Sequence, residues 1–217
     1  MLTKDRLYYP LKRLSDIVLA VLVGIVTSPI CLITAIAIKL DSPGPILADV
    51  PPRVGKNRQP FKILKFRSMI PNAHQMIRQD PKFKKAFAEL KKNNFKLKND
   101  PRITRVGKFI RKYSIDELPQ LINVLKGEMS LVGPRPYYPD ELAEYEKQFP
   151  QTKKLIEEAL TVKPGITGLW QVSGRSDVNF EERIALDAQY ARRKNLIDDI
   201  IILVKSPWVV LTGKGAS

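Results

Sequence analysis

The sequence predicts a helix-rich α/β fold, of the α+β type, that begins with a re-entrant membrane helix. Residues 17–38 carry no charge and are mostly apolar, and Ser28-Pro29 stands at their middle. The remaining chain combines segments of helical periodicity with short segments of strand length. We therefore expect two domains. Residues 1–40 form a broken membrane helix with a basic N-terminal flank, and residues 41–217 form a domain with a small sheet and amphipathic interfacial helices.

The apolar segment is long enough to cross a bilayer, since a straight helix over residues 17–38 measures about 33 Å. Pro29 lacks an N–H and its ring crowds the carbonyl of Ile25, so we expect a kink there. The Ser28 hydroxyl can cover the freed carbonyl. Lys and Arg flank the segment on both sides, which gives no orientation. We favour a helix that breaks at Ser28-Pro29 and returns to the same side over a spanning helix, with a buried core helix as the remaining alternative.

The charge of the chain implies a polyanionic partner. Lys and Arg number 37 against 22 Asp and Glu, a formal net charge of +15. Nucleic acid, anionic lipid and phosphorylated substrates all fit such a surplus. The single cysteine, Cys31, excludes an intrachain disulfide. The single histidine, His74, excludes a structural zinc site of the Cys/His type.

Periodicity, turn residues and charge predict the elements that follow. Residues 41–45, Asp-Ser-Pro-Gly-Pro, form a turn that ends the membrane segment. We then expect strands at 46–50 and 61–66, a basic amphipathic helix over 73–98, a short basic segment at 103–112, a helix at 116–125, an ordered loop at 133–136, helices at 141–149 and 151–160, a turn and strand over 163–172, and a helix at 180–193.

Two segments have an open role. The basic helix over 73–98 either contacts anionic headgroups or presents a solvated face to water. The apolar segment 196–211 contains Pro207-Trp208 and is too interrupted to span. It suits a helix that lies at the membrane interface, with core packing as the alternative.

Residues 114–117, Ser-Ile-Asp-Glu, admit two interpretations. Ser114 as N-cap and Glu117 three residues later form a capping box, which gives the acids no catalytic role. Cations directly precede them: Arg102, Arg105, Lys108, Arg111 and Lys112. Such cations keep an aspartate ionised, and an ionised Asp116 can attack phosphorus. Two adjacent carboxylates also suit Mg²⁺ bound together with substrate phosphates. A phosphoryl-transfer site is therefore the second interpretation.

Four long motifs follow one another along the chain. They are Lys-Phe-Arg-Ser-Met at 65–69, Asp-Glu-Leu-Pro-Gln at 116–120, Gly-Glu-Met-Ser-Leu-Val-Gly-Pro-Arg-Pro at 127–136, and Pro-Gly-Ile-Thr-Gly-Leu-Trp-Gln-Val-Ser-Gly-Arg at 164–175. Together with the Ser-Pro inside the hydrophobic helix, the set resembles the bacterial sugar transferases. These are monotopic phosphoglycosyl transferases that start the assembly of exopolysaccharide, O-antigen and glycoprotein glycans.

The resemblance implies a reaction and a site. A sugar 1-phosphate would pass from a UDP-sugar to undecaprenyl (polyprenyl) phosphate, with release of UMP. Asp116 would be the nucleophile that carries the phosphosugar, Glu117 its dyad partner, and both would hold Mg²⁺. The expected contacts to substrate or its phosphates are Lys65, Arg67, Arg111, Arg135, Arg175, Gln171 and Asp187. Alternatives remain open: a loop-ordering salt bridge for Arg135, core packing for Gln171 and a helix-face charge for Asp187.

The resemblance also implies a location and partners. The catalytic domain would face the cytoplasm at the bacterial inner membrane, among anionic inner-leaflet lipids, without a nucleic-acid partner; a homo-oligomer is compatible with this reading. Residues 169–172 and 180–183 resemble the hexose-using members, so UDP-galactose or UDP-glucose is the expected donor. An N-acetylated UDP-sugar is the alternative donor. A non-enzymatic, membrane-anchored basic binding module is the alternative function.

Overall fold

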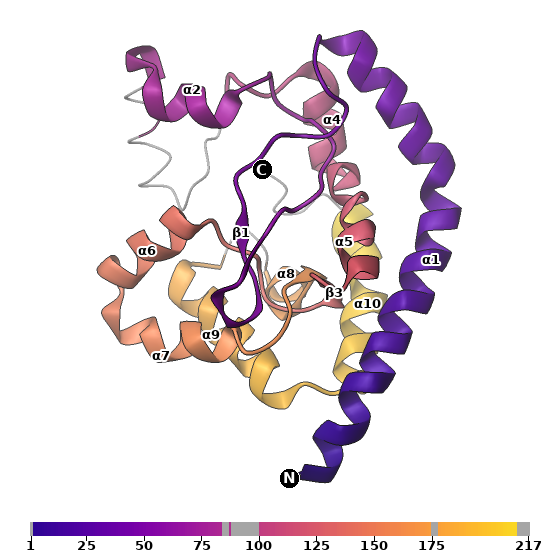
Figure 1. Ribbon diagram of the computed structural model, residues 1–217, viewed down its shortest axis with the longest axis vertical. Helices are drawn as coiled ribbons and strands as arrows, with labels where there is room; N and C mark the ends of the chain where they lie inside the picture. The colour runs from indigo at the N-terminus through magenta and orange to yellow at the C-terminus, as the bar shows by residue number, and fades with distance from the viewer. Residues whose placement is uncertain (1, 84–86, 88–99, 175–177, 212–217) are drawn as a thin grey trace.

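The computed structural model describes residues 2–83, 87, 100–174 and 178–211. Helices dominate this part of the chain, and two small sheets accompany them (Figure 1). In chain order the elements are α1 (Leu2–Asp41), β1 (Arg53–Val54), β2 (Pro60–Phe61), α2 (Ala73–Gln79), α4 (Arg105–Lys112), α5 (Gln120–Lys126), β3 (Ser130–Val132), α6 (Pro139–Gln148), α7 (Lys153–Ala159), β4 (Gly165–Thr167), α8 (Leu169–Ser173), α9 (Phe180–Arg193) and α10 (Leu196–Leu211), with 3-10 turns at Lys56–Arg58, Pro81–Phe83, Ile115–Glu117 and Pro150–Thr152. The predicted helix-rich fold is confirmed.

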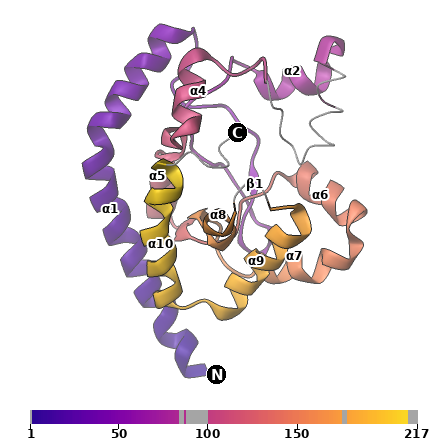
Figure 2. The same cartoon turned by 180° about the vertical axis from the view of Figure 1, so that it is seen from behind.

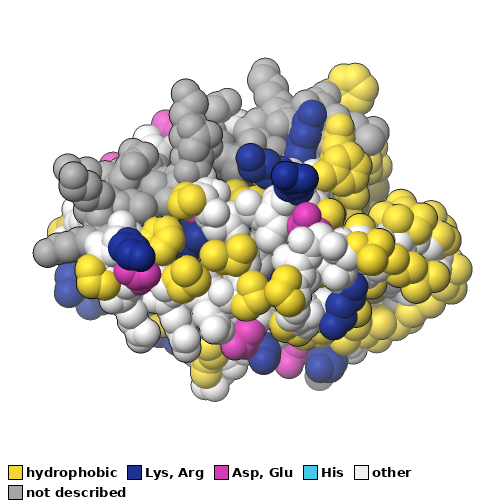
Figure 3. All heavy atoms as spheres, turned by 90° about the horizontal axis from the view of Figure 1, so that it is seen from above, with side chains coloured by type: hydrophobic (Ala, Val, Ile, Leu, Met, Phe, Trp, Pro, Cys, Tyr) yellow, Lys and Arg dark blue, Asp and Glu magenta, His cyan; other side chains and the backbone are white. Residues whose placement is uncertain are grey.

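The helix α1 follows one side of the molecule, and α4, α5 and α10 lie along its inner side (Figures 1 and 2). By length and composition, Leu7–Asp41 is suited to cross a membrane. Ala20 and Ile38 are buried, but no side chain from 21 to 33 is. Large apolar side chains are therefore exposed along α1, at Val18, Leu22, Ile25, Val26, Leu32 and Ile36 among others. They form the hydrophobic edge at the right of Figure 3.

The predicted break at Ser28-Pro29 is not seen, because α1 continues through Pro29 as one bowed helix. The Ser28 hydroxyl donates to the carbonyl of Ile25 at 2.8 Å. That carbonyl is the one that Pro29, which has no N–H, leaves without its helical donor. Thr27 donates in the same way to the carbonyl of Val23 at 2.7 Å. The Ser28 hydroxyl covers the carbonyl that Pro29 frees, and the helix is able to continue.

A buried ionic cluster binds the N-terminal half of α1 to the domain. The carboxylate of Asp16 accepts from the Ser130 hydroxyl at 2.7 Å and from the backbone N–H of Leu131 at 3.1 Å. Lys12 lies between Asp16, at 3.1 Å, and Asp199 of α10, at 3.2 Å. All three charged side chains are buried. The cluster therefore joins α1, β3 and α10 through two ion pairs that share Lys12.

The C-terminal half of α1 is bound to the same domain. Ile38 packs in one apolar cluster with Phe66 and with Ile110 of α4. The Asp41 carboxylate accepts from the N–H of Val106, in the first turn of α4, at 3.3 Å. The helix between Asp16 and Ile38 is about 33 Å long at the usual rise, close to the thickness of a bilayer core. Both ends of a bilayer-length segment are therefore held by one domain.

The sheets are smaller than the sequence predicts. β1 and β2 pair antiparallel, and β3 and β4 pair parallel with Ser130 opposite Gly165. Of the predicted strands at 46–50 and 61–66, Phe61 lies in β2, and an isolated bridge between Leu47 and Phe66 joins the two segments. The N–H of Ala48 donates to the carbonyl of Lys65 at 2.9 Å, but the N–H of Leu64 donates to the side chain of Asn123 at 2.9 Å. Extended segments with such mixed partners form no regular ladder.

The predicted strand over 163–172 is wrong in its second half. β4 ends at Thr167 and α8 follows directly. Close backbone packing explains why glycines stand here, since a Cβ at Gly133 would lie 2.4 Å from the carbonyl of Lys163 and one at Gly165 would lie 2.1 Å from the N–H of Gly133. The backbones of the loop 133–136 and of β4 are therefore in close contact, with no room for a Cβ at either glycine.

The predicted helices agree better. The expected segments 141–149, 151–160, 180–193 and 196–211 correspond to α6, α7, α9 and α10. The basic helix predicted over 73–98 begins at Ala73 as expected, but α2 ends already at Gln79. Asp80 has extended backbone, and a 3-10 turn begins at Pro81. Most of the rest of that prediction, with its lysines at 84–98, lies outside the described residues.

We expect Asp16→Ala to destabilise the protein by about 3–5 kcal/mol, because it removes one partner of a buried ion pair and leaves Lys12 and the Leu131 N–H poorly satisfied. Chemical unfolding in detergent measures this. Asp49→Ala is the matched control, since Asp49 is 86% exposed in its pair with Lys62 and should cost less than about 1 kcal/mol. Equal losses in the two variants would contradict the role given to the cluster.

Candidate active site

A cavity of about 1060 Å³ lies where the four motifs of the sequence meet, and its wall is apolar in one part and basic and aromatic in another. Apolar side chains of α1 and α10 form part of the wall, among them Leu19, Val23, Ile30, Leu203 and Pro207. Basic and aromatic side chains form another part, among them Arg53, His74, Arg102, Arg135 and Tyr138. Lys65, Asp116 and Glu117 also line this cavity. One space is thus bordered by apolar helices, by guanidinium groups and by a pair of acids.

Asp116 and Glu117 lie on the 3-10 turn Ile115–Glu117, between α4 and α5. The predicted capping box is wrong. Ser114 has left-handed backbone with φ of 53° and makes no capping bond, and the α-helix begins only at Gln120, after Pro119. The Glu117 carboxylate instead accepts from Lys65 Nζ at 2.7 Å. The two acids therefore face the cavity and do not cap a helix.

The environment of Asp116 raises its pKa, whereas the sequence predicted an aspartate kept ionised by cations. The residue is 7% exposed, and burial is the largest cause of the raised pKa. Lys65 and Arg111 act in the opposite direction, and Glu117 adds to the raised pKa. Burial therefore outweighs the cations. The result is a carboxylate poorly solvated by water and close to positive charge, which suits a nucleophile.

The motif Lys65-Phe66-Arg67 contacts both the acids and the C-terminal end of α1. Lys65 binds Glu117, and the N–H of Phe66 donates to the carbonyl of Asp116 at 2.9 Å. The Arg67 guanidinium points the other way and donates to the carbonyls of Ser42 at 2.8 Å, of Ile38 at 3.3 Å and of Pro43. It thereby satisfies carbonyls at the C-terminal end of α1, where a cation is also favoured by the helix dipole.

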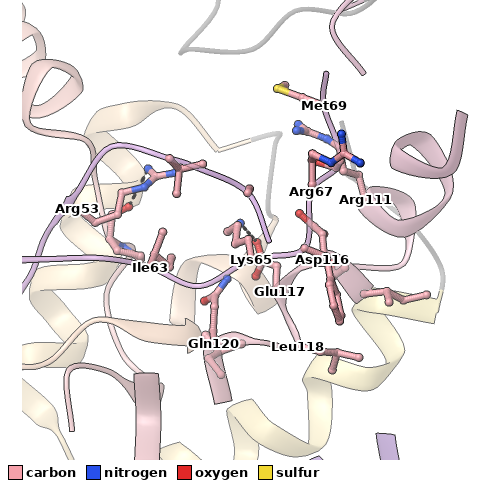
Figure 4. A pocket seen from close by; sticks show the side chains of 18 of the residues that line it. Arg53, Ile63, Lys65, Arg67, Met69, Arg111, Asp116, Glu117, Leu118 and Gln120 are labelled. Atoms are coloured by element: carbon pink, nitrogen blue, oxygen red, sulfur yellow. Dashed lines mark hydrogen bonds and ion pairs between the residues drawn. The ribbon is translucent and has the colours of Figure 1, made fainter. Parts of the chain in front are cut away.

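Arg67 therefore differs from the phosphate contact that the sequence led us to expect. It lines the cavity, but it is 4% exposed and its guanidinium donates to three backbone carbonyls around the end of α1. Figure 4 shows Arg67 and Arg111 close to Asp116, with Arg53 on the other side of the Lys65–Glu117 pair in this view. Sequence reasoning missed the structural use of Arg67, because its partners lie more than twenty residues away in the chain.

The structure brings several other predicted residues to the cavity. Arg111, Arg135 and Gln171 line it, and Gln171 lies on α8 and not on a strand. Arg135 Nη2 lies 4.0 Å from Glu141 Oε1, so the salt bridge expected as the alternative role of Arg135 is present but long. Arg175 lies outside the described residues.

Asp187 is buried behind the loop 133–136 and is absent from the described lining of the cavity. Its Oδ2 accepts from the backbone N–H of Arg135 at 3.2 Å and from the Tyr137 hydroxyl at 3.4 Å. Asp187 is therefore placed to order the loop that carries Arg135. Burial raises the pKa of Asp187 to about 7, against the opposing effect of these donors and of Arg183.

Sequence reasoning also missed Arg53, His74 and Tyr138 as cavity residues, and it gave Arg102 only as one of the cations that precede Asp116. Arg102 is held by Asp100, with bonds of 2.5 and 2.8 Å, and by the carbonyl of Ala73 at 3.1 Å. No local pattern in the sequence marks these residues, because different elements bring them together.

The acids fit Mg²⁺ in one way only. Among the described residues, no group of three or more His, Cys, Asp and Glu side chains gathers in a way that could enclose a metal ion. Asp116 and Glu117 are adjacent carboxylates on the cavity. Mg²⁺ in enzymes is commonly held by one or two carboxylates together with substrate phosphates and water, which is the arrangement these residues allow.

Comparison with known proteins places the chain among relatives along nearly its whole length. The model of the family described as bacterial sugar transferase matches residues 7–213. An undecaprenyl-phosphate galactose phosphotransferase of Salmonella typhimurium is 46% identical over 95% of this chain and 41% of its own length. A UDP-galactose-lipid carrier transferase of Erwinia amylovora is 45% identical over 95% of this chain and 41% of its own. The exopolysaccharide production protein ExoY of Sinorhizobium fredii is 40% identical over 94% of this chain and 87% of its own. The chain thus spans about two fifths of the length of the first two.

We expect Asp187 to make the protein less stable as pH rises from about 4 to about 7. Its pKa is about 7 when folded, against an ordinary value near 3.8, so the folded state keeps a proton that the unfolded chain has already released. The stabilisation by the protonated Asp187 is fully present below the unfolded-state pKa of 3.8. It is lost as pH rises through the folded-state pKa of about 7. In Asp187→Asn this loss should disappear. Between pH 4 and 8 the free energy of unfolding of the unmodified protein should therefore fall by on the order of 1–3 kcal/mol more than that of the variant.

The measurement is the free energy of unfolding by urea in detergent across this pH range. The asparagine keeps an oxygen that can accept from Arg135 and Tyr137, so the loop contacts persist. Asp49→Asn, at an exposed carboxylate, should follow the unmodified protein. If Asp187→Asn also ran parallel to the unmodified protein, the raised pKa would be wrong.

Proposed function

Because the chain belongs to the bacterial sugar transferase family, which its match over residues 7–213 shows, we propose that it transfers a sugar 1-phosphate from a UDP-sugar to undecaprenyl phosphate and releases UMP. The observation that carries the proposal is the cavity, in which a buried Asp116 lies with guanidinium groups and with the apolar sides of α1 and α10. A nucleotide sugar needs the basic wall. A lipid phosphate needs the apolar wall beside it.

The first step is attack by Asp116 on the phosphorus that bears the sugar. A bond forms between the carboxylate oxygen and this phosphorus, and the bond from phosphorus to the bridging oxygen of the diphosphate breaks. UMP leaves with that oxygen, and Asp116 carries the phosphosugar. Lys65 and Arg111 support the step, because both favour the ionised form of Asp116 in a site where burial disfavours it.

In the second step a phosphate oxygen of undecaprenyl phosphate attacks the same phosphorus. The bond to the Asp116 oxygen breaks, the lipid diphosphate sugar forms, and the carboxylate is free again. The reaction is thus a ping-pong exchange through an aspartyl phosphosugar. Glu117 is a second acid next to the nucleophile, and its hydrogen bond from Lys65 at 2.7 Å fixes its position.

Asp116 and Glu117 are also the residues that would hold Mg²⁺ with the substrate phosphates. When bound there, Mg²⁺ supplies neutralisation of the diphosphate charge. Its positive charge would compensate the two adjacent carboxylates as well, one of which is already disfavoured as an anion by burial.

We propose a UDP-hexose as the donor, galactose or glucose, in a pathway that starts a bacterial surface polysaccharide. Two relatives at 45–46% identity carry galactose in their names, and a third is named for exopolysaccharide production. An N-acetylated UDP-sugar is the alternative within the same reaction.

We further propose that α1 enters and leaves the same leaflet of the bacterial inner membrane, with the domain on the cytoplasmic side. Support comes from the two ends of α1, which the Asp16 and Ile38 contacts bind to one domain. A crossing helix would have to release one of them. The exposed stripe on α10, with Ile197, Val204 and Trp208, gives a second apolar contact to the lipid.

The reaction is tested by UMP release from a panel of UDP-sugars, with Mg²⁺ and undecaprenyl phosphate. We expect release with one hexose donor, and a loss of about a thousandfold or more in Asp116→Asn, as removal of a nucleophile gives. EDTA should stop release and added Mg²⁺ should restore it. Asp140→Asn, a half-exposed surface aspartate paired with Arg78, is the control and should keep its activity. Full activity of Asp116→Asn, or silence with every donor in folded protein, would overturn the proposal and favour a binding module.

The topology is tested by labelling single cysteines in a Cys31→Ser background. Leu7→Cys and Leu40→Cys lie on either side of the apolar segment, and both leucines are exposed. A membrane-impermeant maleimide should label neither cysteine in intact spheroplasts and both after lysis. Labelling of one position alone before lysis would show that α1 crosses the membrane.

A further inference from the structure

Arg53 is a buried guanidinium without a carboxylate in contact. It lies on β1 and is 7% exposed. Within the described residues, its one direct hydrogen bond runs from Nη1 to the carbonyl of Pro136 at 3.3 Å, and its buried Nε has no acceptor. Figure 4 shows it at the wall of the cavity. A buried cation with a single neutral acceptor destabilises the folded state. Its presence at a cavity wall is therefore better explained by a ligand than by stability.

Arg102 shows what a structural arginine looks like in the same cavity wall. It is 4% exposed, and both oxygens of the Asp100 carboxylate accept from its guanidinium. In the part of the chain that the structure describes, Arg53 has no such partner. The carboxylates that act on it, Glu117 and Glu141, do so only through space, and Arg135 opposes them. Burial lowers the pKa of Arg53, which is the sign of an undercompensated charge.

The ring of Tyr138 holds Arg53 at the cavity, and His74 contacts Tyr138 in turn. The Cζ of Arg53 lies 3.2 Å from the centre of the Tyr138 ring, so the guanidinium is stacked on that ring. The Tyr138 hydroxyl lies 3.2 Å from His74 Nε2. Burial and the neighbouring cations Arg78, Arg53 and Arg102 lower the pKa of His74 to about 4, so near pH 7 the imidazole is neutral and Nε2 can accept from Tyr138. A stacked guanidinium keeps its N–H groups in the ring-parallel plane, available to a ligand.

Arg135 supplies a second guanidinium to the same wall, and its buried Nε also lacks an acceptor among the described residues. Arg135 has the carboxylate of Glu141 only at 4.0 Å, so the two guanidinium groups together form a site for an anion with several oxygens. We propose that Arg53, stacked on Tyr138 and paired with Arg135, binds phosphate oxygens of a substrate of this enzyme. The inference rests on the proposed function for the identity of that substrate, whose phosphates belong either to the UDP-sugar diphosphate or to the lipid phosphate.

The test begins with binding and needs no turnover. Calorimetry with the full chain in nanodiscs compares UDP with uridine, in the unmodified protein and in Arg53→Met. Loss of a charge-assisted contact should weaken UDP binding by about 10- to 100-fold and leave uridine binding unchanged. Arg58→Met is the matched control, since Arg58 lies just after β1 and pairs with Glu157 and Glu146 away from the cavity. It should bind UDP as the unmodified protein does.

Kinetic measurements distinguish the two sources of phosphate. A higher KM for the UDP-sugar alone assigns Arg53 to the donor. Unchanged UDP binding with a similar rise in the KM for undecaprenyl phosphate assigns it to the acceptor. If neither changes, or if uridine weakens as much as UDP, the inference is overturned.

Two further variants guard against misfolding. Arg53→Lys keeps the charge but loses the stacked fork, so we expect a smaller loss than in Arg53→Met. Tyr138→Phe keeps the ring and loses only the link to His74, and should weaken UDP binding less still. Losses equal to that of Arg53→Met in both, with intact circular dichroism spectra, would contradict direct phosphate binding. Absence of UMP release in the unmodified protein would defeat the proposed function but would leave the binding test valid.

Discussion

The attachment of one long apolar helix to a polar domain at both of its ends is the constraint on which the rest of the structure depends. Asp16 and Lys12 make this attachment near the start of α1, and Arg67 makes it at the end. The same extended segment that carries Arg67 also holds Glu117 and the backbone of Asp116. The acids therefore lie at a set place relative to the helix, because three consecutive residues contact both.

Buried charge has two different uses in this fold. Lys12, Asp16 and Arg102 are neutralised by close partners, and such pairs hold elements together. Asp116 and Arg53 are buried with much weaker compensation, and burial shifts the pKa of each toward its neutral form. Undercompensated charge of opposite sign on one cavity is suited to chemistry on phosphates, since a bound substrate supplies the compensation that the protein leaves out.

The two kinds of wall around the cavity agree with a reaction between substrates of very different polarity. Apolar positions of α1 such as Val23 and Ile30 border the same space as the arginines. The exposed stripes of α1 and α10 extend this apolar surface to the outside of the molecule. A lipid phosphate and a soluble nucleotide sugar could thus reach one nucleophile without either leaving its own medium. This arrangement fits the reaction that we propose for the chain.

The sequence by itself determined the features that arise from neighbours along the chain. Helical periodicity located α6, α7, α9 and α10, uninterrupted apolar residues located most of α1, and four motifs identified the family and the Asp116–Glu117 pair. Only the tertiary structure decided whether α1 breaks at Pro29, whether Ser114 caps a helix, and which arginines are free for a ligand. These depend on partners brought from distant positions: Arg67 meets the end of α1, and Arg53 meets Tyr138, without any local pattern to mark the contact. The energy of a buried charge is set by such partners, and so its role could not be predicted from residue type alone.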